Sequence, residues 1–417
     1  MRIFTWLLLL GGLASGTEAF EIERRQDQFE SNTGYLVLPA PYSYPGIGDG
    51  WVLVGYAGNI FDTMTDAYAL WITGDASGVI AEVDELFLVP QFFYLSYFSM
   101  DIRKFGRNFY QNRGMVTEKE DFSVAVGDLY INQEPSVTLT VWERRLELNY
   151  ALRHQEGRTT EIRTPEGDLI SSSVQTFESD STKLSMLLDL TDDYNDPRSG
   201  LRLEQSREQF LSAKDTDSDY EVLTSNLTAY IPIGEESTWL FNYYQSAALV
   251  TRSGETDLDT LKTLLGLDYC ASILLAAEQT ACEEAITRDA LNQQMANRNG
   301  TARALGGPDR LRSYPEERYQ GAHSQSLGTE FRWNLRTGEN LQDWVFLRDV
   351  FKVIQLAVFY EQGSVAETST ELGDHWRKSY GLGGRLVTGS GSVYRLDWAT
   401  GNEGSELTVL FEYPWKN

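Results

Sequence analysis

The sequence of 417 residues carries 61 acidic against 35 basic residues, a net charge of −26, and an aromatic content of 12%. This acidic balance excludes nucleic acid as a partner, because phosphate binding requires concentrated positive charge. After the first twenty residues no apolar run approaches the length of a membrane-spanning helix, about eighteen residues, which excludes a helical membrane protein.

The N-terminus predicts export. Arg2 is followed by an apolar run from residue 4 to residue 14 and then by small residues, so residues 1–19 are interpreted as a signal peptide cleaved after Ala19. Residues 20–33 then form a short periplasmic segment ahead of the first strand. The protein is therefore expected in the bacterial outer membrane, with membrane lipid as its surroundings.

Alternation of apolar and polar residues predicts strands along the rest of the chain. In residues 146–153 every second side chain is Leu or Tyr, and residues 327–335 repeat the pattern with Leu, Phe and Trp. Sixteen candidate strands result: 34–41, 50–58, 66–74, 78–89, 91–102, 121–132, 143–154, 183–191, 200–209, 219–231, 237–250, 325–336, 351–361, 377–388, 391–399 and 405–413.

Alternation alone fits a secreted β-sandwich as well as a membrane barrel. The mid-strand charges Arg332, Glu361, Arg395 and Asp397 fit a wet lumen, and an even number of strands of about nine to twelve residues fits a tilted membrane span. The predicted fold class is therefore all-β, a 16-stranded antiparallel transmembrane β-barrel that occupies residues 34–417.

The first and last strands meet where such a barrel closes. Pro39 and Pro41 are two residues apart, so both missing N–H groups point to the same edge of the first strand. If that edge faces the last strand, with Leu407, Val409 and Phe411, the seam is weak and suits a lateral gate. Alternatively, the prolines only end a short strand.

The longest connection, residues 251–324, is predicted on the extracellular side, folding partly into the lumen. Residues 254–297 within it show helical spacing of Leu and Ala. Cys270 and Cys282 are expected to form one local disulfide, because export brings them into an oxidising compartment. The stapled hairpin is either a cap over the pore mouth or a surface decoration.

Three motifs in the second half resemble the bacterial surface antigen superfamily, the outer-membrane insertases and translocases that include BamA, TamA and FhaC. Leu311-Arg312-Ser313-Tyr314 in the long loop is similar to the family's Val-Arg-Gly-Phe or Tyr signature. The strand Gly328-Thr329-Glu330-Phe331-Arg332 is similar to its Glu-x-Arg strand. Phe359-Tyr360-Glu361-Gln362-Gly363 is similar to its Phe-x-Asp-x-Gly strand, with Glu in place of Asp.

The resemblance implies that the long loop enters the lumen and that Arg312 pairs with Glu361, shared with Glu330. Phe359 and Gly363 lie on the same inward face as Glu361, Tyr314 belongs to the loop signature, and Gly363 leaves room for the loop. Alternatively, the pair only braces the barrel, because buried ion pairs often fix a conformation without adding stability.

The chain departs from the family pattern in two places. Ser313 replaces the signature glycine, which affects the expected turn of the loop. The family's periplasmic POTRA domains are not found between the predicted cleavage site and the first strand, so any activity that depends on them is not expected unless a separate periplasmic partner supplies it.

The expected function is that of an outer-membrane insertase or translocase barrel acting on an unidentified client. The first alternative is a passive pore that prefers cations. The second is a barrel-embedded hydrolase, which is disfavoured because the sequence has no Gly-x-Ser-x-Gly elbow and only three histidines. The few histidines and cysteines also give no basis for a metal site, and no cofactor is expected.

Overall fold

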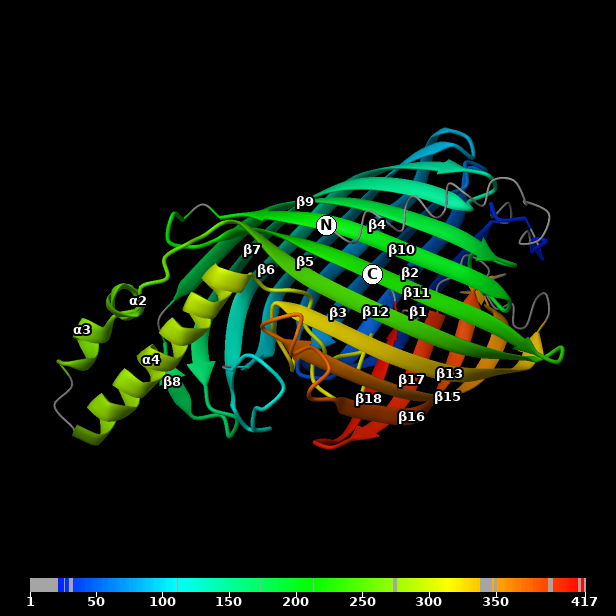
Figure 1. Cartoon of the computed structure of the whole chain (residues 1–417). Helices are drawn as coiled ribbons and strands as arrows, with labels where there is room; N and C mark the ends of the chain where they lie inside the picture. The colour runs from blue at the N-terminus through cyan, green and yellow to red at the C-terminus, as the bar shows by residue number, and fades with distance from the viewer. Residues whose placement is uncertain are drawn as a thin grey trace.

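The computed structural model describes residues 22–415 apart from 26, 30–32, 111, 173, 213, 273–275, 338–346, 349–350, 389–392 and 412–413. Within the described residues sixteen strands form the wall of a barrel (Figure 1). They are β1 (Gly34–Tyr44), β2 (Gly48–Ile60), β3 (Thr65–Gly74), β4 (Ser77–Val89), β5 (Phe93–Tyr110), β6 (Phe122–Val141), β7 (Leu146–Arg163), β9 (Gln175–Thr191), β10 (Gly200–Leu211), β11 (Asp219–Ile233), β12 (Ser237–Arg252), β13 (His323–Thr337), β15 (Phe351–Ala366), β16 (Arg377–Thr388), β17 (Val393–Gly401) and β18 (Gly404–Phe411). Two short strands are added, β8 (Leu169–Ser171) in a connection and β14 (Leu347–Arg348).

Each wall strand pairs antiparallel with its neighbours in the chain, and β1 meets β18 to close the ring. The predicted fold class, a 16-stranded antiparallel barrel, is confirmed. Antiparallel neighbours need only short turns, and the chain supplies them, as at Pro90–Phe92 between β4 and β5.

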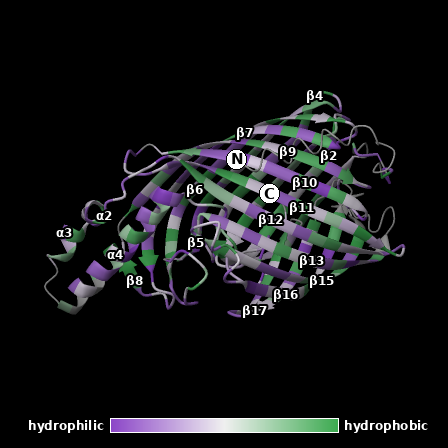
Figure 2. Cartoon of the chain, in the orientation of Figure 1, coloured by the Kyte–Doolittle hydropathy of each residue, from purple (hydrophilic) through white to green (hydrophobic). Residues whose placement is uncertain are grey.

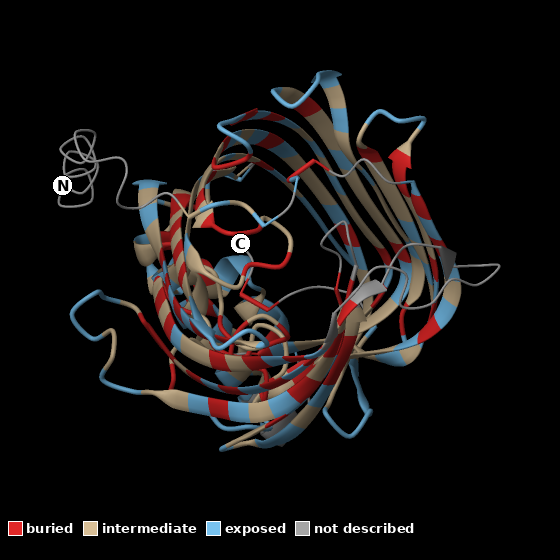
Figure 3. Ribbon diagram, turned by 90° about the vertical axis from the view of Figure 1, so that its right-hand side faces the viewer, coloured by how far each residue is buried: buried red, intermediate tan, exposed pale blue. Residues whose placement is uncertain are grey.

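The alternation of side chains has the orientation of a barrel in lipid. Along β12, Trp239, Phe241 and Tyr243 point outward and are exposed, whereas Leu240 and Asn242 point inward and are buried. Apolar side chains recur around the outside of the wall. Figure 2 shows hydrophobic and hydrophilic residues interleaved along the strands in view. The sandwich interpretation is therefore wrong, because the buried polar face encloses a lumen that Figure 3 shows end-on.

Several strands are longer than the alternation predicted, and four of them are the longest of the barrel. β5, β6, β7 and β9 contain 18, 20, 18 and 17 residues and continue past the apolar belt toward one end of the barrel. Their extensions replace apolar side chains by charged cross-strand pairs, such as Arg158 with Asp128 at 2.7 Å. An apolar-polar pattern does not register such residues, so the strands predicted for β5, β7 and β9 stopped short of this end. For β6 the missed residues are 133–141 at the opposite end, where exposed Val137, Leu139 and Val141 do alternate with polar residues.

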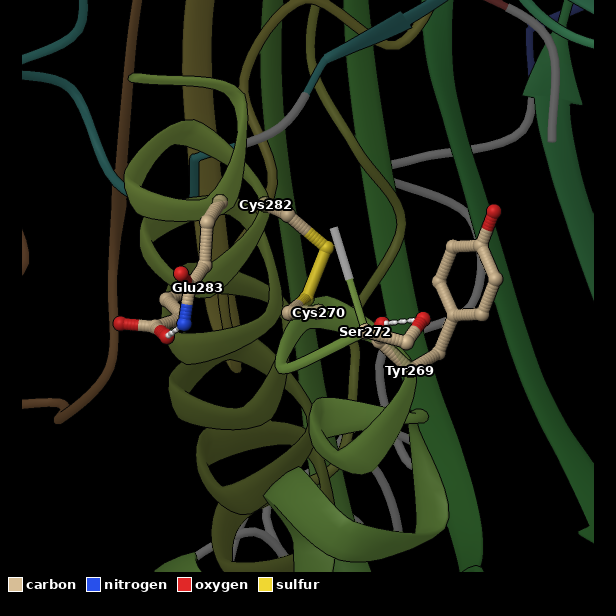
Figure 4. The surroundings of a disulfide bond; sticks show 6 residues. Tyr269, Cys270, Ser272, Cys282 and Glu283 are labelled. Atoms are coloured by element: carbon tan, nitrogen blue, oxygen red, sulfur yellow. Dashed lines mark hydrogen bonds between the residues drawn. A yellow bond between two sulfur atoms is a disulfide. The ribbon is translucent and has the colours of Figure 1, made fainter. Parts of the chain in front are cut away.

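The end that carries these extensions, here called the loop end, also carries the helices. They are α2 (Leu258–Leu264), α3 (Leu267–Cys270) and α4 (Ala276–Asn299), which extend away from the barrel as an arm (Figure 1). The predicted disulfide between Cys270 and Cys282 is confirmed and joins α3 to α4 (Figure 4). None of the helices among the described residues is both long enough and apolar enough to span a membrane.

The opposite end, here called the N-terminal end, holds the segment before β1. The predicted signal peptide, residues 1–19, lies outside the described residues. Arg24 contacts Asp189 at 3.1 Å, and Arg25 contacts Asp192 at 2.9 Å and Asp193 at 3.1 Å, in and beside the turn after β9. This turn lies across the ring from β1, so the segment crosses the mouth of the barrel before the wall begins.

Candidate functional site

Residues 300–322, here called the lumen loop, run from α4 to β13 and enter the barrel from the loop end. Leu305, Leu311 and Tyr319 are fully buried and form an apolar cluster with Tyr244 of β12 and Val365 of β15. An isolated bridge between Leu305 and Tyr319 folds the loop back on itself. The loop is therefore a packed internal element, as the resemblance implied.

Arg312 lies at the tip of this loop and is completely buried. Its Nε donates to Glu361 Oε1 at 3.0 Å, and its backbone N–H donates to Glu361 Oε2 at 3.0 Å. Its Nη1 donates to Glu330 Oε2 at 3.1 Å and to Asp397 Oδ2 at 2.8 Å. The structure thus brings together Arg312, Glu361 and Glu330, and it adds Asp397 as a partner that the sequence analysis did not identify.

The wall positions these carboxylates by register. Glu330, Glu361 and Asp397 occupy inward positions of β13, β15 and β17, so their side chains converge on one patch of the lumen. Phe359 shares the inward face of β15, and its ring centroid lies 3.3 Å from the guanidinium carbon of Arg312. Cation–π contact and charge-assisted hydrogen bonds therefore hold the same side chain from different directions.

Gly363 follows Glu361 by two residues in β15, so both residues lie on the same inward face. A Cβ atom there would lie 2.7 Å from Leu305 Cδ1 and 3.0 Å from Leu311 Cδ1. The space that glycine leaves is therefore filled by apolar side chains of the lumen loop. A larger residue at this position would push the loop off the wall.

Ser313 stands where the family signature has glycine. Its side chain fits because β16 and β17 leave room for it. Its backbone N–H donates to Ser379 Oγ at 2.9 Å, and a Cβ atom at Gly401 would lie 2.3 Å from Ser313 Oγ. Tyr314 is fully buried, and its hydroxyl donates to the carbonyl oxygen of Lys378 at 3.2 Å. The turn at Ser313 is thus held in place by contacts with β16 and β17, and not by a glycine in the loop.

Three more arginines surround these carboxylates. Arg332 Nε lies 2.7 Å from Glu330 Oε1, Arg385 Nη2 lies 2.9 Å from Glu330 Oε2, and Arg395 Nη1 lies 3.4 Å from Asp397 Oδ2. We call the seven residues the lock cluster: Arg312, Arg332, Arg385, Arg395, Glu330, Glu361 and Asp397. Desolvating so many charges is expensive, so the cluster depends on keeping every partner in place.

Other contacts anchor the lumen loop elsewhere on the wall. Arg303 pairs with Glu208 of β10, which also accepts from Ser181 Oγ at 2.7 Å. Arg318 Nη2 lies 2.8 Å from Glu403, in the turn between β17 and β18. The sequence analysis missed these anchors because the partners are more than eighty residues apart and have no shared motif.

The seam between β1 and β18 is the second candidate site. β1 pairs with β2 through eleven consecutive residue pairs, but among the described residues it pairs with β18 only at Ser43 and Val409. The Ser43 hydroxyl adds one hydrogen bond to the carbonyl oxygen of Leu407 at 2.9 Å. Phe411 ends β18 and pairs with Tyr394 of β17, away from β1. Among the described residues this junction therefore has the fewest residue pairs of the wall, and β1 pairs beyond it only with β14, at Tyr35–Arg348 and Leu36–Leu347.

Pro39 and Pro41 lie within β1 and do not end it, because the strand continues to Tyr44. Their pairing with Leu53 and Trp51 belongs to an unbroken register with β2. A ladder keeps this register only if the missing donors point away from β2, that is, toward β18. The two prolines thus remove hydrogen-bond donors from the edge that faces the seam.

Comparisons with known proteins found similarity only to solved structures. No family model and no curated protein matches the chain. Among solved structures, the chain is similar to BamA from Haemophilus ducreyi lacking POTRA domains 1–3, with 11% identity, a TM-score of 0.49, and coverage of 92% of this chain and 70% of that one.

Two further similar structures carry the name CdiB. The protein from Escherichia coli shows 12% identity and a TM-score of 0.49 over 90% of this chain, and the one from Acinetobacter baumannii shows 11% and 0.47 over 91%. The chain spans 61% and 59% of the length of these two relatives.

Proposed function

We propose that this protein is an outer-membrane insertase or translocase barrel whose wall opens sideways at the β1–β18 seam. The observation that carries the proposal is that, among the described residues, β1 pairs with β18 only at Ser43–Val409 and with β14 at two residues, against eleven pairs between β1 and β2. A strand edge with unpaired backbone groups accepts another strand readily. Such an edge facing lipid suits the transfer of a client strand from the barrel into the membrane.

The lumen loop supports this proposal over a passive pore. Arg312, Tyr314 and Arg318 are almost completely buried inside the barrel, so the lumen near the lock cluster is filled. A passive pore that prefers cations would instead keep an open, hydrated path. Steady conductance of the unaltered protein in a planar bilayer would favour the pore.

The test joins the seam covalently. Ser43→Cys and Val409→Cys face each other across the seam, so oxidation should bond β1 to β18. The purified protein is placed in phosphatidylcholine vesicles, and an eight-stranded outer-membrane barrel is diluted into them from urea. We expect the protein to speed the folding of that client, and the cross-link to return the rate to that of empty vesicles.

Each single-cysteine variant, oxidised in the same way, serves as the matched control and should retain the full rate. Full activity of the cross-linked protein would contradict a lateral gate. No acceleration by the unaltered protein would contradict insertion itself. The proposal includes a client protein in the cell and a periplasmic protein that delivers it. Cross-linking at Ser43 would capture either partner.

A further inference from the structure

Two arginines of the lock cluster face each other directly on neighbouring strands. Arg385 of β16 and Arg395 of β17 are residue partners in the antiparallel ladder. Both side chains are on the inward face of the wall and are completely buried. Like charges directly opposite each other destabilise a sheet, and the low dielectric of a buried site strengthens their repulsion. The pair therefore needs a negative charge close to both guanidinium groups.

The carboxylates of the lock cluster supply only part of that charge. Arg385 Nη2 donates to Glu330 Oε2 at 2.9 Å and lies 3.4 Å from Asp397 Oδ1. Arg395 Nη1 donates to Asp397 Oδ2 at 3.4 Å, which is a long hydrogen bond. Glu330 Oε2 and Asp397 Oδ2 also accept from Arg312, at 3.1 Å and 2.8 Å. The four arginines of the cluster thus share three carboxylates, which leaves one excess positive charge.

Several N–H donors of the two arginines have no acceptor within the described part of the chain. A guanidinium group carries five N–H donors. Among the described residues, Nε and Nη1 of Arg385 and Nε and Nη2 of Arg395 are buried and make no hydrogen bond. The carboxylate of Asp309 in the lumen loop lies 3.9 Å from Arg395 Nη2, beyond hydrogen-bond distance, and its side chain is 40% exposed. Buried donors of this kind are costly and can mark the place of a bound water or ion.

We propose that Arg385 and Arg395 bind one small monovalent anion, such as chloride, between their guanidinium groups. One negative charge matches the single excess positive charge of the lock cluster. Chloride accepts N–H donors from any direction, so it can serve both guanidinium groups at once. Water accepts the same donors but leaves the two cations without a counter-charge.

The neighbours of the arginine pair favour a small anion over a large or doubly charged one. Two residues farther toward the N-terminal end, Val387 and Val393 face each other on the same inward side, and they form a buried apolar cluster with Val353 of β15. On the other side of the arginines, Gly383 faces Asp397. A sulfate or phosphate ion would have to lie against methyl groups or against a carboxylate. The site is a property of the wall and does not depend on the proposed function.

The test measures the unfolding temperature of the purified protein in detergent while sodium chloride replaces sodium gluconate at constant ionic strength. Gluconate has the same charge but is much larger than chloride, and constant ionic strength keeps the screening of surface charges unchanged. By linkage, each tenfold increase in chloride above half-saturation should raise the unfolding temperature by the same increment, roughly 2 °C for a chain of this size.

Variants at Arg395 assign the response to the arginine pair. Arg395→Gln removes one of the two facing charges and should make the unfolding temperature independent of chloride, whereas Arg395→Lys keeps the charge and should retain a weaker dependence. Arg207→Gln alters an arginine that is 60% exposed on the outer face, and this control should respond to chloride as the unaltered protein does.

The line width of the chloride NMR signal detects binding directly, so it remains informative if Arg395→Gln lowers the stability. The unaltered protein should broaden the signal, and Arg395→Gln should broaden it several-fold less. Equal unfolding temperatures of the unaltered protein in chloride and in gluconate, without broadening, would overturn the proposal. A chloride response that persists in full in Arg395→Gln would overturn it as well, because the ion would then bind elsewhere.

Discussion

Glu316 is the residue of the lumen loop whose charge state depends on the pH near neutrality. Its Oε2 accepts from the Tyr44 hydroxyl of β1 at 3.1 Å. Burial raises the pKa of its carboxyl to about 8, helped by the neighbouring carboxylates Glu317 and Asp309 and opposed by Tyr44 and by Arg107 of β5. A neutral carboxyl therefore suits this site better than a charged one.

The sign of the pH effect follows from linkage. The pKa is higher in the folded protein, so the stabilising contribution is complete below the ordinary value of 4.5 and is lost as the pH rises toward 8. We predict that Glu316→Gln unfolds at the same temperature as the unaltered protein near pH 4 and at a higher temperature near pH 9. Thermal unfolding in detergent across this pH range measures the difference.

Glu166→Gln, which alters an exposed carboxyl in the connection after β7, is the control and should follow the unaltered protein at every pH. An equal difference between Glu316→Gln and the unaltered protein at pH 4 and pH 9 would show that packing, not ionisation, separates them.

For individual residues, the sequence predicted some contact partners of Arg312 and missed others. Arg312 and Glu361 were paired through the resemblance, and the alternation placed Phe359 on the inward face beside them. Asp397 and Arg385 could not be assigned to the same cluster, because their proximity depends on the register between β16 and β17.

Among the elements, the helical arm is held by one covalent bond and by contacts at its base. The disulfide joins residues twelve positions apart in sequence. At the base, Asn297 Nδ2 donates to the carbonyl oxygens of Thr216 at 2.8 Å and Glu255 at 2.7 Å. Exposed Leu264 and Tyr269 show that the far part of the arm has little packing of its own.

We therefore predict a local effect of removing the disulfide. A closed loop of this size constrains the unfolded chain by about 3 kcal/mol, so Cys270→Ala with Cys282→Ala should loosen α2 and α3. Hydrogen exchange followed by mass spectrometry should speed up there by at least tenfold, while the base of α4 and the lumen loop keep their protection. Faster exchange in residues 303–322 would instead show that the arm restrains the lumen loop.

The strands show where pattern reasoning succeeds at the scale of elements. Lipid on one side and a polar lumen on the other impose strict alternation, and sixteen strands were predicted from it. Where β5, β6, β7 and β9 leave the apolar belt, both faces meet water and the constraint disappears. The missed extensions of β5, β7 and β9 therefore lie where the physical cause of the pattern ends, whereas residues 133–141 of β6 were missed although they alternate.

For the whole molecule, the proposed function gives the lumen two separate exits, one at the lock cluster and one at the seam. The first runs along the barrel axis and is filled by the lumen loop around Arg312. The second runs sideways between β1 and β18, where Ser43 and Val409 form the one described residue pair. If the exits are independent, a change in one should leave the other unaltered.

Arg312→Ala, alone and together with the oxidised Ser43→Cys and Val409→Cys pair, tests this independence. Removing one partner from a buried ion cluster costs roughly 3–5 kcal/mol, so the lumen loop should loosen and the unfolding temperature should fall. We expect higher single-channel conductance in both proteins, because the ions pass along the axis. Client folding in vesicles should be lost only where the seam is joined.

Arg207→Ala, which removes an exposed arginine that pairs with Glu221 on the outer face, controls for the loss of charge and should leave conductance unchanged. Conductance that vanishes on joining the seam would mean that the ions leave through the wall, and that the lumen loop does not close the axial path. Unchanged conductance and unfolding in Arg312→Ala would remove the proposed role of the lock cluster. The two readouts together thus assign each exit to its own residues, because only the axial path depends on Arg312 and only the lateral path depends on the seam.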